Sequence, residues 1–176
     1  MQNKLRILVT GSEGFLGRHT VRYMTEQGHK VVGIDQDIFK DGLPNENFDV
    51  MFHFAAFVGG RKGIDSNLYL ITKNIDLDRI VVEWAETHVG KIIYPSSCAA
   101  YPKALQTQQG TPMREDMAGG ETFDMYGMSK LAAECMLKFA NVKSHIMRPF
   151  TIYGPGQSMD YPLPAIIERA KRGECS

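Results

Sequence analysis

The chain has 176 residues, of which 43% are hydrophobic and 23% are charged, a composition that suits one globular domain with a buried core. Lysine plus arginine equals aspartate plus glutamate at 20 each, without a basic cluster, so no nucleic-acid partner is indicated and a small-molecule partner is expected. The cysteines Cys98, Cys135 and Cys175 are too widely spaced to predict a disulfide framework or a zinc site, and no run is apolar enough for a signal peptide or membrane span, so we expect a cytoplasmic protein.

Short apolar runs alternate along the chain with longer segments of helical periodicity. The expected strands are RILVT at 6–10, KVVGID at 30–35, DVMFHFAA at 49–56, KIIYPSS at 91–97 and HIMRPFTIYG at 145–154. The expected helices cover 17–28, 67–89, 126–140 and 162–176, and a stretch rich in Pro, Gln, Gly and Thr from 98 to about 122 is expected to be an irregular active-site loop. This alternation predicts an α/β fold, a doubly wound parallel sheet wrapped by helices.

The first expected strand runs into three glycines, Gly11, Gly14 and Gly17, directly before a helical segment. Glycines in this spacing allow a tight turn and let backbone N–H groups approach a pyrophosphate, which the positive end of the helix dipole also favours. The alternative is a plain strand-to-helix turn that binds nothing. We interpret the motif as a dinucleotide site.

The second expected strand ends in Asp35, whose carboxylate can accept hydrogen bonds from the adenosine ribose hydroxyls. A 2′-phosphate would meet a like charge there, so Asp35 favours NAD over NADP. Arg18 is a counter-signal, because a guanidinium near the ribose could bind a phosphate. An arginine on a helix surface explains Arg18 as well, and we predict NAD.

The third expected strand ends in FHFAA, where the small residues Ala55 and Ala56 let a cofactor lie close to the backbone. We interpret His53 as a packed core residue rather than a catalytic residue or a metal ligand. The five histidines show no ligand spacing, so no metal site is predicted.

A tyrosine and a lysine, Tyr126 and Lys130, stand four residues apart and therefore on one face of an expected helix. A nearby ammonium favours the phenolate, so we expect Lys130 to lower the pKa of Tyr126 and make it a usable base. Ser96 and Ser97 end the preceding strand, at the edge where open parallel sheets bind ligands. The alternatives are an exposed helix pair and two hydroxyls that cap a strand end.

Taken in chain order, the glycine motif, Asp35, HFAA, Asn74, the serine pair and YGMSK resemble the extended short-chain dehydrogenase/reductase family, specifically its NAD-dependent nucleotide-sugar epimerases and dehydratases. The match runs from about Leu5 to Gly156, and it implies a Rossmann fold, NAD as cofactor and a nucleotide-sugar substrate. The resemblance implies cofactor contacts from Gly11, Gly14, Phe15, Leu16, Gly17, Asp35, Phe54, Ala55, Ala56, Asn74, Tyr126, Lys130 and Phe150, and a catalytic set of Ser97, Tyr126 and Lys130. Ser97 is preferred to Ser96 because it has the family spacing to Tyr101.

Within that family, AAFVGG, SSCAAYP and PMRED look similar to enzymes that act on GDP-sugars. Those enzymes use a cysteine just after the serine, and Cys98 falls one position short, so we interpret Cys98 as a small hydrophobe. Two departures are internal: the segment between Asp35 and His53 is short, which predicts a trimmed strand-helix unit, and Thr151 stands where the family has asparagine.

The resemblance also implies that the C-terminal substrate domain is largely missing, so we expect a Rossmann domain with the catalytic centre at 1–156 and the start of a truncated substrate-binding region at 157–176. The expected activity is epimerisation or dehydration of a nucleotide sugar by transient oxidation of a sugar hydroxyl. Two alternatives stay open: a non-catalytic NAD-binding module or subunit, and a net NAD-dependent sugar dehydrogenase or reductase. Relatives commonly dimerise through the helices that carry Asn74 and Lys130, so a homodimer is expected.

Overall fold

The centre of the protein is a parallel sheet of five strands in the order β2-β1-β3-β4-β5. The computed structural model describes residues 3–57, 68–107, 112–122 and 124–174. The strands are β1 Arg6–Thr10, β2 Lys30–Ile34, β3 Phe48–His53, β4 Val89–Pro95 and β5 Lys143–Met147. Every neighbouring pair is parallel, which confirms the predicted sheet.

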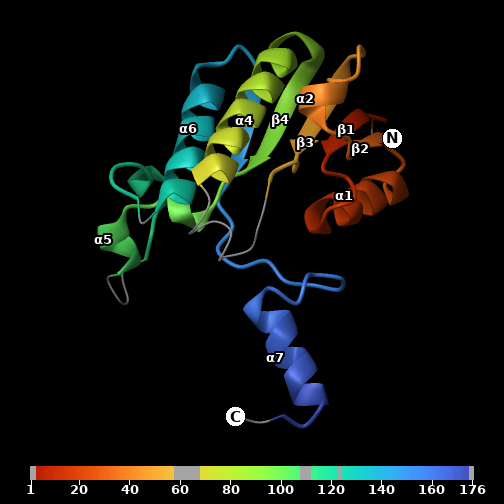
Figure 1. Cartoon of the computed structure of the whole chain (residues 1–176). Helices are drawn as coiled ribbons and strands as arrows, with labels where there is room; N and C mark the ends of the chain where they lie inside the picture. The colour runs from red at the N-terminus through yellow and green to blue at the C-terminus, as the bar shows by residue number, and fades with distance from the viewer. Residues whose placement is uncertain (1–2, 58–67, 108–111, 123, 175–176) are drawn as a thin grey trace.

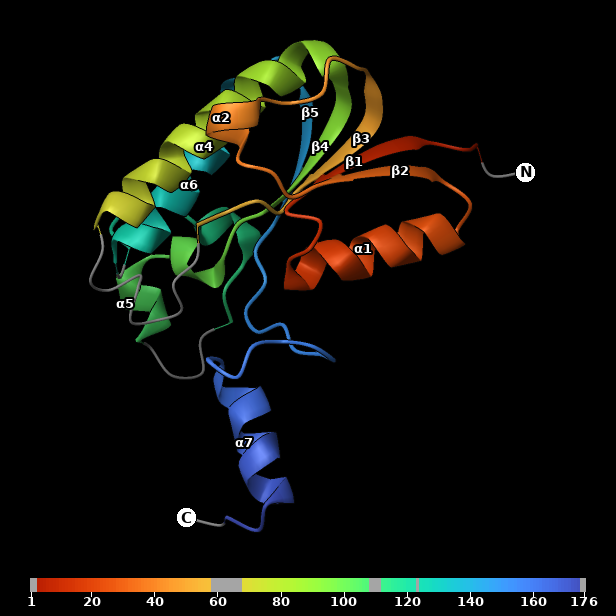
Figure 2. The same cartoon turned by 45° about the vertical axis from the view of Figure 1, so that its right-hand side comes forward.

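Helices cover both faces of this sheet, as the doubly wound prediction requires. The helices are α1 Phe15–Glu26, α2 Ile38–Asp41, α4 Leu68–His88, α5 Lys103–Gln106, α6 Met125–Phe139 and α7 Pro162–Lys171, with 3-10 turns at Cys98–Ala100 and Glu115–Met117. Figures 1 and 2 show α1 on one face and the adjacent helices α4 and α6 on the other. The connection between β2 and β3 holds only the single-turn helix α2, as the short segment after Asp35 predicted.

The starts of the helices follow local chemistry. The carboxylate of Asp124 accepts a hydrogen bond from the Gly127 N–H at 2.8 Å and caps α6, which places Tyr126 in the first turn. In α7, Pro162 is the first residue, where its missing N–H leaves no intrahelical bond unmade. By contrast, Gly14 precedes α1 without any side-chain cap.

Several predicted boundaries differ from the structure; for example, the helix predicted at 162–176 ends at Lys171. The strand predicted at 145–154 was wrong in its second half, because β5 ends at Met147. Pro149 has no backbone N–H to donate to a ladder, and the chain leaves the sheet there. The predicted loop from 98 to about 122 is irregular, but it contains α5 and the two 3-10 turns. The sequence motif AAFVGG falls partly, at 58–60, outside the described residues.

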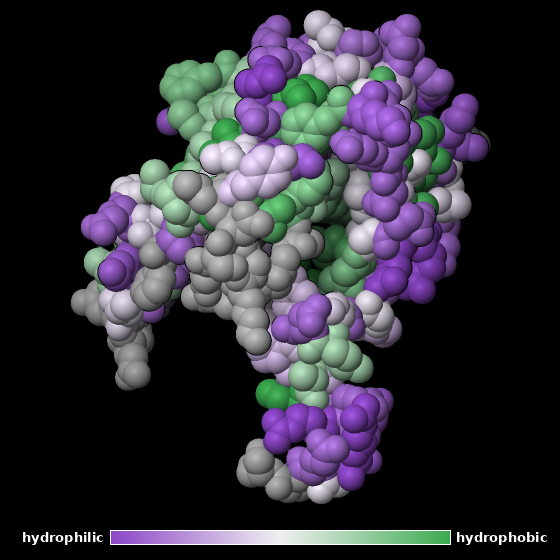
Figure 3. Space-filling model, in the orientation of Figure 1, coloured by the Kyte–Doolittle hydropathy of each residue, from purple (hydrophilic) through white to green (hydrophobic). Residues whose placement is uncertain are grey.

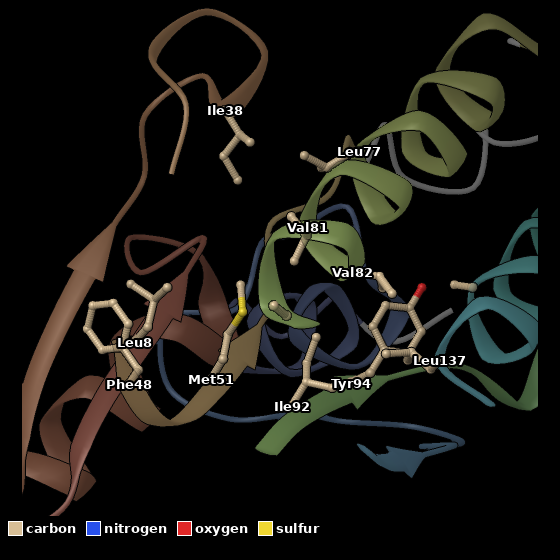
Figure 4. Close-up of a cluster of buried hydrophobic side chains, with 12 residues drawn as sticks. Leu8, Ile38, Phe48, Met51, Leu77, Val81, Val82, Ile92, Tyr94 and Leu137 are labelled. Carbon is tan, nitrogen blue, oxygen red and sulfur yellow. The ribbon is translucent and has the colours of Figure 1, made fainter. Parts of the chain in front are cut away.

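The hydrophobic core lies between the sheet and the pair α4 and α6. The parallel register puts Leu8, Met51 and Ile92 in one row across three strands, and all three side chains are fully buried. Figure 4 shows this row facing Val81 of α4, with Leu137 of α6 beside Tyr94. Such burial on both sides of the strands is why their sequences read as continuous apolar runs.

Helix α7 stands apart from the sheet, and the segment that leads from β5 to it runs below the carboxyl ends of the strands (Figures 1 and 2). That connection is tied to α1, because the Arg18 guanidinium donates to the Gly156 carbonyl and a ring nitrogen of His19 lies 3.1 Å from the Pro155 carbonyl oxygen. The isoleucines of α7, Ile166 and Ile167, are exposed. In the described parts of the chain, no helix has the length and apolarity needed to cross a membrane.

Candidate active site

A cleft of about 1060 Å³ opens at the carboxyl ends of the strands. It lies where the strand order reverses between β1 and β3, the place where open parallel sheets bind ligands. All sequence-predicted site residues line it: Gly11, Gly14, Phe15, Leu16, Gly17, Asp35, Phe54, Ala55, Ala56, Asn74, Ser97, Tyr126, Lys130 and Phe150. Figure 3 shows a hollow with hydrophobic surface between the sheet body and α7. The fold therefore brings residues from seven separate segments into one site.

Gly11 and Gly17 are packed against their neighbours too tightly for a side chain. A Cβ on Gly11 would lie 2.7 Å from the Ala55 backbone nitrogen, and Gly11 has a positive φ of 64°. A Cβ on Gly17 would lie 2.0 Å from the Gly11 carbonyl oxygen. The glycines thus let β1, α1 and the segment after β3 approach one another.

The start of α1 offers backbone donors to the cleft. The N–H groups in the first turn of any α-helix have no intrahelical partner, and here no side chain from the described residues caps them. Phe15, Leu16 and Gly17, which supply these groups, line the cleft. An uncapped helix start beside a glycine cradle fits a pyrophosphate, whose charge the helix dipole also favours.

The far end of the cleft is bounded by residues that follow β2. Asp35 is exposed there, next to Phe39 of α2. The Lys73 ammonium of α4 lies 4.0 Å from the Phe57 ring centroid and 5.4 Å from that of Phe39, and so joins the two rings. Sequence reasoning missed these aromatic walls. It also left Arg18 open as a phosphate ligand, but its guanidinium is bonded to Gly156 and does not line the cleft.

Asn74 shapes the wall of the cleft through its amide group. Its Oδ1 accepts from the Phe57 N–H at 2.7 Å, and its Nδ2 donates to the Phe57 carbonyl at 2.9 Å. This pair of bonds fixes the backbone that follows FAA after β3. Asn74 is therefore placed beside the predicted cofactor region with most of its hydrogen-bonding capacity already used.

The two serines after β4 face different partners. Ser97 lies beside the Tyr126 phenol and opposes the rise in its pKa, and the Ser97 Oγ accepts from the Ala99 N–H at 3.1 Å. Ser96 is buried and donates to Glu134 instead. The structure thus brings together the serine and the tyrosine that the sequence selected.

Lys130 points to β4 rather than to the Tyr126 hydroxyl. Its Nζ donates to the Tyr94 hydroxyl at 3.1 Å and to the Pro95 carbonyl at 3.1 Å, and it lies 5.9 Å from the centroid of the Tyr126 ring. Burial raises the pKa of Tyr126, and Ser97 opposes that rise only in part. In the protein alone the Lys130 ammonium bonds Tyr94 and does not offset this rise; the predicted joint effect of Lys130 and the positive nicotinamide ring stays a prediction.

Behind the site lies a chain of buried polar groups that the sequence analysis did not find. His53 is 1% exposed, and its two ring nitrogens lie 2.7 Å from Thr10 Oγ1 and 3.1 Å from Asp78 Oδ1. Its prediction as a packed core residue is confirmed. The Tyr94 hydroxyl donates to Asp78 Oδ2 at 2.9 Å. The available signal was that Asp78 shares the buried face of α4 with Val82, four residues on.

Glu134 of α6 and Arg148 after β5 form a second buried pair. Arg148 donates to both carboxylate oxygens, with Nε 2.8 Å from Oε1 and Nη2 2.6 Å from Oε2. Burial alone would raise the pKa of Glu134, but the bonds from Arg148 and Ser96 outweigh it and lower that pKa. The same pairing raises the pKa of Arg148. This pair holds the chain that leaves β5 against α6.

The Glu134 pair predicts a loss of stability in acid. Because the folded-state pKa of Glu134 is lowered, its stabilisation is complete above the unfolded value near about 4.3 and is lost as the pH falls through the folded pKa. We expect Arg148→Met to reduce the free energy of unfolding by about 2 kcal/mol at neutral pH and by much less in acid. Urea titrations across the pH range measure this. The control Arg114→Met removes an exposed partner of Asp116 and should change nothing measurable; an equal loss would contradict the role of Glu134.

Cys98, which we interpreted from the sequence as a small hydrophobic residue, packs beside the site but does not line the cleft. Its Sγ is 3.9 Å from the Phe150 carbonyl oxygen. A metal site is not formed by the described residues, which contain no group of three His, Cys, Asp or Glu side chains able to hold an ion.

Solved structures confirm the fold. The chain superposes on MoeE5 in complex with UDP-glucose and NAD with a TM-score of 0.79 and 26% identity, over 96% of this chain and 62% of that one. It superposes on the UDP-glucuronic acid 4-epimerase from Bacillus cereus in complex with UDP-glucuronic acid and NAD with a TM-score of 0.75 and 24% identity, over 95% and 63%. These likenesses define a Rossmann-like α/β fold of the kind that the cleft requires.

The chain belongs to the NAD dependent epimerase/dehydratase family, whose model matches residues 7–176. A similar curated protein is the GDP-mannose 3,5-epimerase of Arabidopsis thaliana, 30% identical over 86% of this chain and 48% of the relative. The UDP-N-acetyl-alpha-D-glucosaminuronate decarboxylase of Bacillus cytotoxicus is 28% identical over 94% of this chain and 60% of its own length. The chain therefore spans about half to three fifths of the relatives that it matches.

Proposed function

We propose that this chain is the NAD-binding and catalytic part of a nucleotide-sugar epimerase or dehydratase that acts by transient oxidation of a sugar hydroxyl. One observation carries the proposal: a single cleft joins the uncapped start of α1 to Ser97, Tyr126 and Lys130. The first element suits a pyrophosphate, and the second suits proton removal from a hydroxyl. Membership of the family supports the same activity.

The cofactor would be held along the whole cleft. Backbone N–H groups of Phe15, Leu16 and Gly17 would bind the pyrophosphate beside Gly11 and Gly14, and Asp35 would bind the adenosine ribose. Asn74, Tyr126 and Lys130 would contact the middle of the cofactor. The cleft walls along the cofactor would be formed by Phe54, Ala55, Ala56 and Phe150. The Asp35 carboxylate supports NAD over NADP, since a 2′-phosphate would meet its negative charge at an exposed position. The bond from Arg18 to Gly156 removes the strongest counter-signal.

NAD, when bound, supplies a hydride acceptor and a positive charge near the phenol. Tyr126 then takes the proton of the sugar hydroxyl at its phenolic oxygen, and Ser97 donates a hydrogen bond to the oxygen that loses the proton. With the positive nicotinamide ring, the Lys130 ammonium, 5.9 Å from the Tyr126 ring centroid, would favour the phenolate although its own hydrogen bonds go to β4. In the described part of the chain, only two of its three N–H donors have partners, so one donor is left for a ligand.

The substrate is a nucleotide sugar by analogy with the relatives, which are named for GDP- and UDP-linked sugars. The division at residue 156 stays a prediction. It is supported by Ser158, Tyr161 and Leu163, which line the cleft although they lie in the segment expected to begin the substrate-binding region. That segment would close the sugar end of the site. The sugar, its nucleotide and the final step are left open by these residues.

A homodimer through α4 and α6 is the proposed assembly. Large apolar side chains are exposed on these helices, namely Tyr69, Met125, Met128 and Phe139. Pairing of such residues with a second copy would remove them from water. The cytoplasmic location also stays a prediction.

A direct test supplies purified protein with NAD and, in parallel, GDP-mannose or UDP-glucose. We expect saturable NAD binding by calorimetry, at least about tenfold tighter than NADP binding. We also expect a transient NADH absorbance with one of the two sugars that decays without net reduction. Steady accumulation of NADH would instead indicate a dehydrogenase, and NAD binding without reduction under either sugar would favour a non-catalytic module.

A further inference from the structure

The hydrogen bonds of the buried polar groups behind Lys130 all run toward Asp78. The Lys130 Nζ donates to the Tyr94 hydroxyl, and the Tyr94 hydroxyl donates to Asp78 Oδ2. From the other side, the Ala55 N–H donates to Thr10 Oγ1 at 3.2 Å, which leaves the Thr10 hydroxyl proton for His53 Nδ1. Both branches therefore end on the carboxylate of Asp78.

The protonation of His53 follows from this arrangement. If Thr10 donates to Nδ1, the ring is neutral and carries its proton on Nε2, which faces Asp78 Oδ1. Every polar hydrogen of Thr10, His53 and Tyr94 then has an acceptor. A protonated ring would leave the Thr10 hydroxyl hydrogen without its acceptor in a fully buried position. In this pattern the His53 ring donates to Asp78 without needing a charge of its own.

Asp78 is 5% exposed, so its negative charge needs compensation inside the protein. The other carboxylate near Lys130 is Glu134, and Arg148 already pairs with it through two hydrogen bonds. In the described part of the chain, hydrogen bonds lead from Asp78 to one ammonium, that of Lys130, one hydroxyl away. Conversely, Lys130 is itself partly buried, and a nearby anion stabilises its charge.

We propose that Asp78 is a positioning residue of the active site: its buried carboxylate is the counter-ion of the Lys130 ammonium and orients it through the Tyr94 hydroxyl. The role rests on the proposed function, because it assigns Asp78 to the site that would carry the chemistry. Asp78 also lines the cleft, but both of its carboxylate oxygens are hydrogen-bonded, to His53 and to Tyr94, so it acts through Lys130 rather than on a ligand. It keeps the amine charged and turned toward the floor of the cleft.

The electrostatics of the surrounding groups agree with this role. The titratable groups that face Lys130 are Asp78 on α4, Tyr94 on β4, and Tyr126 and Glu134 on α6, with His53 on β3 behind Asp78. Burial lowers the pKa of Lys130, and the negative charges of Asp78 and Glu134 oppose that fall. Burial and Asp78 together raise the pKa of Tyr94 well above its usual value, so its hydroxyl stays protonated and can bridge the pair.

The test follows the ammonium itself by NMR in protein carrying isotope-labelled lysine, with the Lys130 signal assigned by its loss in Lys130→Arg. Without Asp78 the amine loses the nearer unpaired anion, so we expect Asp78→Asn to lower the titration midpoint of Lys130 by about 1 pH unit or more. Tyr94→Phe keeps the ring and the carboxylate but removes the bridge, and we expect a smaller fall. The effects of the double variant should be less than additive, since both act on one path.

The matched control is Asp76→Asn, which removes an equal charge from an exposed position on the same helix and should leave the midpoint unchanged. If Asp78→Asn does not fold, Tyr94→Phe decides the matter, because its hydroxyl can be removed without a change of shape. An unchanged midpoint in the folded variants, or an equal shift in Asp76→Asn, overturns the proposal. The titration needs no NAD or sugar, so such a failure leaves the proposed function standing, while absent NADH formation in wild-type protein would overturn the function alone.

Discussion

Replacing Tyr126 with phenylalanine is expected to lower the rate of NADH formation from NAD and the reactive nucleotide sugar by about a thousandfold, within the range for loss of a general base. The phenol of Tyr126 lies in the cleft beside Ser97, and its oxygen could take up the proton of a sugar hydroxyl. The ring remains in the variant, so NAD affinity measured by calorimetry should stay within about twofold of wild type. Single-turnover absorbance measurements give the rate.

The pH dependence provides a second readout for Tyr126. Burial raises the pKa of Tyr126, so the fraction of phenolate, and with it the wild-type rate, should rise as the pH is raised from neutrality. The phenylalanine variant should lack this rise. Tyr153→Phe is the matched control, because Tyr153 is 67% exposed and lies outside the cleft lining, and its rate should equal wild type. Retained activity in Tyr126→Phe would remove Tyr126 from the mechanism.

Replacing Gly17 with alanine should have the largest effect on the fold. The new Cβ would lie 2.0 Å from the Gly11 carbonyl oxygen and 2.7 Å from the Ser12 Cα, and both are backbone atoms that no rotamer change can move. We expect the free energy of unfolding to fall by about 3 kcal/mol or more, at the upper end for overpacked sites. The stabilisation that NAD gives to the native protein in urea titrations should be lost as well.

Gly14→Ala serves as the comparison within the same loop. A Cβ on Gly14 would meet only the Gly11 carbonyl oxygen, at 3.1 Å, and Gly14 has no positive φ. Its cost should be about 1 kcal/mol or less, since alanine is a poorer helix N-cap than glycine. Equal losses of unfolding free energy in Gly14→Ala and Gly17→Ala would show that the loop responds to any added methyl group. The overlap of the Gly17 methyl group with the Gly11 carbonyl would then not be the reason.

The sequence predicted the sheet because the evidence for it is local. The apolar runs that contain Leu8, Met51 and Ile92 are buried on both sides, and no other fold class alternates such runs with amphipathic helices. The site could be assembled in advance for the same reason. Residues that follow parallel strands meet at one edge, so Gly11, Ser97 and their neighbours had to share a cleft.

What the sequence could not predict depends on contacts between distant segments. The spacing of Tyr126 and Lys130 allows an approach of the two side chains but does not require it, and Lys130 found a better acceptor in Tyr94, 36 residues earlier. The role of Asp78 could not be predicted from the sequence for a related reason. A carboxylate on an apolar helix face has meaning only once His53 and Tyr94 are known to lie beneath it.

The close approach of Gly11 to Ala55 has a consequence for the order in which the protein matures. The strands on the two sides of that contact are joined by the bond between Thr10 and His53, which are 43 residues apart, so a growing chain has β1 and α1 long before it has β3. Pairings between such distant segments form late in folding. β3 must therefore emerge from the ribosome before the nascent chain can form the proposed nucleotide site. We expect a fragment that ends at β2 not to bind the nucleotide.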